Sequence, residues 1–120
     1  MSISNYLENA LLDTLRAQSF SVSSVYLKLH TGDPGEAGTA NAATNTSRQL
    51  VSFNASSGGS MASSAAVTWT NVSTTETYTH WSAWDSATAG NCLWSGALSA
   101  SASVAAGDTF QITSLTLTLD

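Results

Sequence analysis

The sequence predicts a mainly β protein, with a single antiparallel β-sandwich that is jelly-roll-like, has six to eight strands and carries a short N-terminal α-helix. Apolar residues recur at three- and four-residue intervals only near the start of the chain, and from about residue 25 they alternate with polar residues in short runs. Turn-forming residues separate these runs at intervals typical of sandwiches and barrels. Because 120 residues is the length of one ordinary domain, we expect one domain over 1–120.

A helix is predicted over about residues 3–18. Its apolar stripe has helical spacing and consists of Ile3, Tyr6, Leu7, Ala10, Leu11 and Leu15. Asn5 followed by Glu8 fits a capping pair at the start of the helix. The serines around Phe20 favour an end near Gln18.

The first strand is predicted at Val25–His30, where apolar and polar residues alternate as in a strand with one buried face. It ends at residues 31–38, where a proline and three glycines favour a turn. A long loop is therefore expected over about residues 31–47. Loops of this length are usually functional or disordered, so the loop is either a contact arm for a partner or a mobile surface segment.

Five further regions have the alternation of strands and are separated by turn residues: Gln49–Phe53, Ala65–Trp69, Thr77–Trp84, Cys92–Leu98 and Thr109–Leu119. Residues 56–60 predict a flexible connection between the first two of these regions. In the last region the apolar residues change parity between Ile112 and Leu115. We therefore expect a bulge or bend near Thr113–Ser114.

Charge and cysteine content exclude several classes of partner. Arg16, Lys28 and Arg48 are the only fixed positive charges against eight carboxylates, so we expect no nucleic-acid partner. Cys92 is the only cysteine, which excludes an internal disulfide and a cysteine-cluster zinc site. The start of the chain lacks the features of a signal peptide, and no run is long enough to cross a bilayer, so we expect no membrane partner.

No catalytic centre is predicted. The sequence has no Gly-x-Ser-x-Gly motif, and His30 and His80 lie on predicted strands with no motif that connects them to a serine or to Cys92. We therefore expect a protein without enzymatic activity.

No cofactor or metal site is predicted either. Gly32, Gly35 and Gly38 recur every three residues, but Asp33 and Glu36 between them would repel a phosphate. The same carboxylates lack the spacing of a calcium loop, and turn chemistry alone accounts for them.

The aromatic residues leave two interpretations open. A cluster is formed by Trp69, Tyr78, His80, Trp81, Trp84 and Trp94. Exposed tryptophans would form a platform for sugar rings or an interface hot spot, whereas buried ones would be the large residues of the core. In a regular strand Trp81 has the opposite parity to Tyr78 and Trp84, so we expect a division between core and surface, with most in the core.

Several blocks of the sequence resemble a known family. Leu29-His30-Thr31-Gly32-Asp33-Pro34-Gly35, followed by Gly38-Thr39-Ala40-Asn41, resembles the signature loop of small tailed-bacteriophage virion proteins labelled as head-decoration, head-fibre, minor tail or tail-fibre proteins. Further blocks that are similar to this family are Arg48, Phe53, Ser57-Gly58-Gly59, Val67 to Asn71, Thr79-His80, Trp84-Asp85, Leu93 to Leu98 and Gly107 to Phe110. The similarity extends over nearly the whole chain, although Trp81 and Cys92-Leu93 depart from the family pattern.

The resemblance implies a virion structural protein with no enzymatic activity and no cofactor. The function we expect first is a capsid decoration or cement protein, a homotrimer that binds the major capsid protein and stabilises the shell. The alternatives are a tail or tail-fibre component, and a carbohydrate-binding module for host-surface glycans that uses Trp81, Trp84 or Trp94. We expect synthesis in the host cytoplasm and a final location in the virion, at the capsid surface rather than the tail.

The residues expected to contact a partner belong to the long loop and to the aromatic cluster. They are Asp33, Pro34, Gly35, Glu36, Arg48, Trp81 and Trp84.

Overall fold

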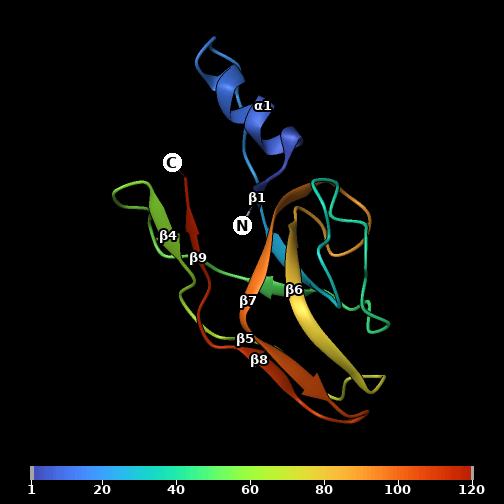
Figure 1. The fold of residues 1–120 in the computed structure, drawn as a ribbon. Coiled ribbons are helices and arrows are strands. Elements are labelled where there is room, and N and C mark those ends of the chain that lie inside the picture. The colour runs from blue at the N-terminus through green and yellow to red at the C-terminus, as the bar shows by residue number, and fades with distance from the viewer. Residues whose placement is uncertain (1, 120) are drawn as a thin grey trace.

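The computed structural model describes residues 2–119 and confirms the predicted class, a mainly β fold with a short helix (Figure 1). A central five-stranded sheet has the order β1-β7-β6-β2-β3, and two smaller sheets pair β4 with β9 and β5 with β8. All of these pairs are antiparallel. The strands are β1 (Ser2–Ile3), β2 (Val25–His30), β3 (Gln49–Val51), β4 (Ser60–Ala62), β5 (Val67–Trp69), β6 (Glu76–Trp84), β7 (Cys92–Val104), β8 (Phe110–Ile112) and β9 (Thr116–Thr118).

The structure adds two short strands to those expected. Strand β1 pairs with β7, and β4 begins at Ser60, in the segment predicted as a flexible connection. The described residues therefore form nine strands, one more than the upper end of the prediction. The predicted bend near Thr113–Ser114 is confirmed, since the chain leaves β8 there and enters β9 in a different sheet.

Helix α1 spans Asn5–Thr14, which is shorter than predicted, and projects away from the strands (Figure 1). The predicted capping pair of Asn5 and Glu8 is wrong, because Ser4 is the N-cap. Its Oγ accepts a hydrogen bond from the Leu7 backbone N–H at 3.2 Å and donates one to the Cys92 carbonyl at 2.6 Å. The cap is therefore selected by a contact with the sheet that the local sequence does not reveal.

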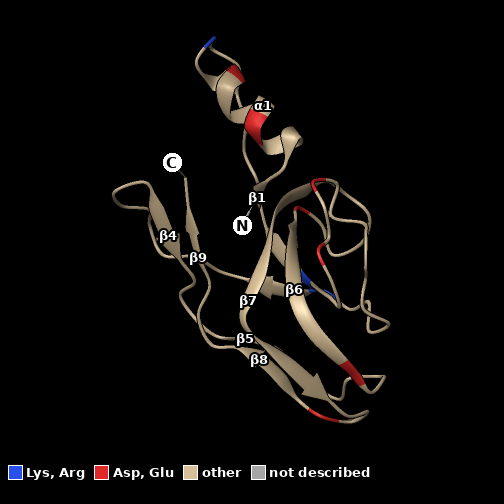
Figure 2. Ribbon diagram, in the orientation of Figure 1, with Lys and Arg blue, Asp and Glu red and all other residues tan. Residues whose placement is uncertain are grey.

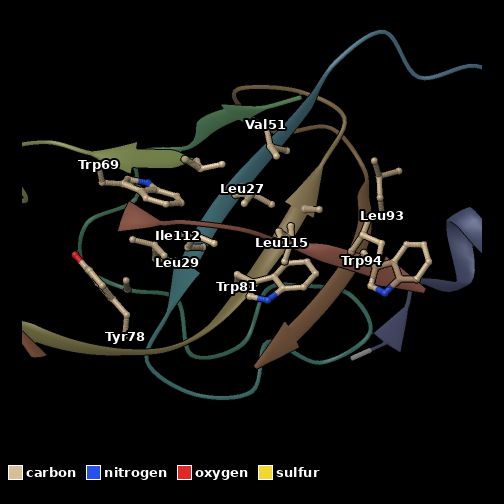
Figure 3. Packing of buried hydrophobic residues seen from close by; sticks show 14 of the residues in the cluster. Leu27, Leu29, Val51, Trp69, Tyr78, Trp81, Leu93, Trp94, Ile112 and Leu115 are labelled. Carbon is tan, nitrogen blue, oxygen red and sulfur yellow. The ribbon is translucent and has the colours of Figure 1, made fainter. Parts of the chain in front are cut away.

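The core lies between the central sheet and the two smaller sheets (Figure 3). Leu27 pairs with Ala83, and Leu29 pairs with Trp81, so these side chains share one face of the central sheet. The small sheets and the segment between β8 and β9 contribute further buried residues, which include Val67, Trp69, Ile112, Leu115 and Leu117. This burial of apolar area is the main stabilising contribution to the fold.

The aromatic cluster lies almost entirely inside the protein. Trp69, Tyr78, Trp81, Trp84 and Trp94 are all buried, so the expected division of tryptophans and tyrosine between core and surface is wrong. The pairing of β6 with β7 shifts register between Tyr78 and His80 and again between Ala83 and Trp84. Near Trp84 the extra residue lies in β7, so Trp81 and Trp84 keep opposite parity in β6. Both are buried because the small sheets cover one face of the central sheet and the connection between β2 and β3 covers the other.

Candidate protein-contact site

The connection between β2 and β3, residues 31–48, covers the face of the central sheet opposite the core. On this face His30, Ser82 and Trp84 point toward the connection. The His30 Nδ1 atom lies 2.9 Å from the Ala40 carbonyl oxygen, and His30 forms a β-bridge with Ala42. In Figure 1 the connection is the cyan and green trace beside β6.

Hydrogen bonds close the first half of this connection into an ordered loop. Asp33 Oδ1 accepts from the Gly35 N–H at 2.9 Å, as in an Asx turn, and the Pro34 carbonyl accepts from the Ala40 N–H at 3.0 Å. Asn41 Nδ2 donates to the Asp33 carbonyl at 2.9 Å. Since the ends and the tip are all bonded, the loop is held in place rather than being a mobile surface segment.

Glu76 fixes the second half of the connection. Its two carboxylate oxygens accept the backbone N–H groups of Thr44 and Asn45 at 2.9 and 3.0 Å. A carboxylate that accepts two amides is a strong, charge-assisted anchor. The loop is thus attached to the start of β6 as well as to the end of β2.

A buried polar network connects the loop to the sheet. Ser82 Oγ accepts a hydrogen bond from the Trp84 indole N–H at 2.7 Å and lies 2.7 Å from His30 Nε2. With Nδ1 of His30 donating to the Ala40 carbonyl, the Ser82 hydroxyl donates to Nε2, and every polar atom has a partner. His30 and Ser82 are both 0% exposed, so this network specifies the packing of the loop without reaching solvent.

The stability of the protein is expected to fall below about pH 6.5 through His30. Burial lowers the pKa of His30, and the hydrogen bond to Ala40 opposes this effect only in part. Above the unfolded-state pKa, about 6.5, the ring is neutral in both states and contributes no pH dependence. Below that pH the unfolded chain binds a proton that the folded chain takes up only at lower pH, so the free energy of unfolding decreases on acidification.

Urea unfolding at a series of pH values from 8 to 5 measures this effect. His30→Gln should weaken the pH dependence below about pH 6.5, and His80→Gln, at the other histidine of the chain, is the matched variant. An unchanged slope in His30→Gln would contradict the assignment.

Arg48 and Gly38 complete the packing around Trp84. The Arg48 guanidinium lies 4.2 Å from the centre of the Trp84 ring, and its Nη1 donates to the carbonyls of Ser86 and Ala89 at 2.8 and 2.7 Å. Gly38 packs against Cys92 and Trp84 so closely that no Cβ fits. Burial raises the pKa of the Cys92 thiol to about 11, so this sulfur is a protonated packing atom.

The seven predicted contact residues fall into two groups. Asp33, Gly35 and Glu36 are exposed on the loop and are available to a partner. Pro34, Trp81 and Trp84 are buried, and Arg48 is half-buried and occupied by internal contacts. Pro34, Trp81 and Trp84 therefore offer no exposed surface in this structure, because the rest of the chain covers them.

Exposed apolar residues on α1 form a second surface. Tyr6, Leu12 and Leu15 are 43%, 63% and 85% exposed, whereas Leu7 is the one buried residue of the helix. The apolar stripe in the sequence predicted the helix correctly. The fold buries fewer residues of this stripe than the pattern suggested. Next to the helix, Leu11, Trp94 and Leu119 line a mostly apolar groove.

Residues 2–119 contain no group of three or more potential metal ligands, and none of their helices is long and apolar enough to span a membrane.

Comparison with known proteins identifies a family. The model of a family described as "Podophage GP4 fiber I protein gp80" matches residues 2–120 of the chain. No curated protein matches.

Proposed function

The chain belongs to the phage virion family of the podophage GP4 fiber I protein gp80, and from this membership we propose that it is a non-enzymatic structural subunit of a phage fibre. It works through contacts with copies of itself and with neighbouring virion proteins. The family match over residues 2–120 is the observation that carries the proposal. It supports the tail-fibre alternative of the sequence analysis better than capsid decoration.

The exposed surfaces support a role in protein contacts. Helix α1 projects from the strands (Figure 1). The side chains of Leu12 in the helix and of Leu15 at its C-cap are exposed to solvent. The loop tip at Asp33–Ala37 lies near the start of α1. The hydroxyl of Ser2, two residues before the N-cap of the helix, donates to Glu36 Oε1 at 3.1 Å. An apolar helix beside an ordered acidic loop is typical of a surface that a partner covers.

The interior supports the absence of enzymatic activity. Ser82 and His30 have the spacing of a nucleophile and its base, but both are fully buried and Ser82 Oγ already accepts the Trp84 indole N–H. A substrate carbonyl cannot reach this hydroxyl without unfolding the loop. The buried pair is therefore best explained as a structural network.

The glycan alternative receives less support. A sugar-binding platform needs an exposed aromatic face, and Trp81, Trp84 and Trp94 are 2%, 6% and 8% exposed. A titration with host-surface glycans should therefore leave the tryptophan fluorescence unchanged.

Capsid decoration is the second candidate, because the family that the sequence blocks resemble includes proteins labelled as head-decoration as well as tail-fibre proteins. The two candidates differ in stoichiometry, which quantitative mass spectrometry of purified particles measures relative to the major capsid protein. A fibre subunit is expected at a small number of copies per particle. A ratio near one, or a simple fraction of one, would overturn the fibre proposal in favour of decoration, and absence from particles would overturn both.

A further inference from the structure

Among residues 2–119, one long edge of the central sheet has no partner strand. Strand β1 pairs with β7 only at Trp94 and Ser95, so it covers only the beginning of that strand. Beyond Ser95, β7 continues to Val104 with β6 as its neighbour on one side and no strand on the other. None of the loop and turn hydrogen bonds between backbone groups in residues 2–119 involves Gly96–Val104, so the outer N–H and C=O groups of this segment face outward without a backbone partner.

The residues along this edge are small and uncharged. No ionisable side chain occurs between Asp85 and Asp108, except the buried Cys92 thiol, and Figure 2 shows β7 without a charged residue. The run Ala97–Ser103 is mostly exposed. Proteins usually protect an open edge with lysine, proline or a covering segment, and this segment contains neither residue. Between Ala97 and Ala102 the pairing with β6 is interrupted, because Leu98–Ser101 lie opposite Thr79 alone. This bulge bends the strand and makes the edge less regular, but it leaves the outer side without a partner strand.

A groove runs along the same edge. It has a volume of about 340 Å³, with Gly96–Ala100 as one wall and the segment Phe110–Thr116 as the other. Hydroxyl and amide groups of Ser99, Gln111 and Thr113 line it, and none of its lining residues is charged. Free backbone groups beside such a groove are the features that bind an extended chain by strand addition.

The geometry points to pairing of the β7 edge with the β7 edge of a second copy, antiparallel and across a two-fold axis. The absence of charge and the small side chains of this edge favour a second copy as the occupant. Each copy carries a net charge of −5, so acidic surfaces of two copies repel, whereas this neutral run allows two backbones to approach closely. Small alternating Ala and Ser side chains make the edge self-complementary, as a two-fold interface requires. A two-fold pairing gives a dimer, which differs from the homotrimer expected for a capsid decoration protein.

A glycan fits the groove less well than a strand. Sugar rings stack on exposed aromatic faces, and the aromatic residues in the lining are the buried Trp81 and the partly buried Phe110. Main-chain hydrogen bonds to the open edge require another backbone.

Sedimentation velocity of the full chain over a wide concentration range tests the inference. The wild type is expected to form dimers, and Ala100→Lys is expected to raise the dimer dissociation constant by at least about tenfold, since it places two lysines close together at the centre of the paired edges. Ala55→Lys, at an exposed position in the connection between β3 and β4, adds the same charge elsewhere and should leave dimerisation unchanged. Hydrogen exchange of the wild type supplies a measurement that needs no variant, because the amides of Ala97–Ser103 should gain protection only at dimer concentrations.

Three outcomes would overturn the inference: a wild type that stays monomeric, a trimer in place of a dimer, or equal effects of Ala100→Lys and Ala55→Lys. If the double variant Leu12→Ser/Leu15→Ser loses the dimer and Ala100→Lys keeps it, the interface lies on α1 and not on β7. If the monomer binds a neutral glycan and Ala100→Lys abolishes that binding, the groove is a sugar site. The inference rests on the proposed structural role, but a monomeric protein still found in particles at fibre stoichiometry would overturn only the β7 pairing.

Discussion

Replacement of Trp81 by alanine is expected to lower the free energy of unfolding by about 3–5 kcal/mol, the usual cost of deleting a large aromatic side chain from a core. The indole is 2% exposed and lies between β6 and the small sheets (Figure 3). Its ring packs against Gly96, where a Cβ would come within 2.7 Å of a ring carbon. The cavity left by alanine cannot collapse easily, because the backbone of β7 forms one of its walls.

Urea unfolding monitored by circular dichroism measures this cost, since it does not depend on the fluorescence of the deleted tryptophan. Leu12→Ala is the matched control, because that side chain is 63% exposed on α1 and should change the free energy of unfolding by no more than about 0.5 kcal/mol. A loss of about 1 kcal/mol or less in Trp81→Ala would show that Trp81 is not the centre of the core.

Gly38→Ala is expected to destabilise the protein by roughly 2–4 kcal/mol, as the sum of backbone strain and overpacking. Gly38 has φ +73°, a conformation that costs an L-residue energy, and an added Cβ would collide with Cys92 Sγ and lie 3.1 Å from a ring carbon of Trp84. Because the loop packs on Trp84 at this point, the loop should detach or the sheet should shift.

Gly35→Ala separates the two contributions. Gly35 has the same φ of +73° but nothing within 4 Å of an added Cβ, so it should lose only about 1–2 kcal/mol from backbone strain. Thermal or urea unfolding of both variants measures the difference. The double variant Gly38→Ala/Cys92→Ala should recover part of the loss, because it removes the sulfur. Equal losses in Gly35→Ala and Gly38→Ala would show that the contact with Cys92 and Trp84 contributes nothing.

The local pattern of the sequence determined the main elements. Alternation of apolar and polar residues located β2 at Val25–His30, and the parity change after Ile112 predicted the break between β8 and β9. These features depend on neighbours within a few residues, where steric and hydrophobic preferences act directly. The blocks that resemble phage virion proteins also indicate the class of protein without reference to the fold.

Contacts between distant segments were decided by the tertiary structure. The partner of the Ser4 hydroxyl is the Cys92 carbonyl, 88 positions along the chain, and the partner of His30 Nε2 is Ser82, 52 positions away. No local pattern specifies such pairs. The burial of both Trp81 and Trp84 likewise depends on distant segments, because the two small sheets cover one face of the central sheet and the connection between β2 and β3 covers the other.

The sequence by itself therefore determined the β class, the positions of most strands, the negative net charge and the resemblance to phage virion proteins. The tertiary structure alone decided which surfaces remain free: the ordered loop tip at Asp33–Ala37, the apolar side of α1 and the open edge of β7. The physical reason is that exposure depends on what the rest of the chain covers. Trp84 and Leu15 have similar hydrophobic character, yet the fold buries the first and leaves the second 85% exposed.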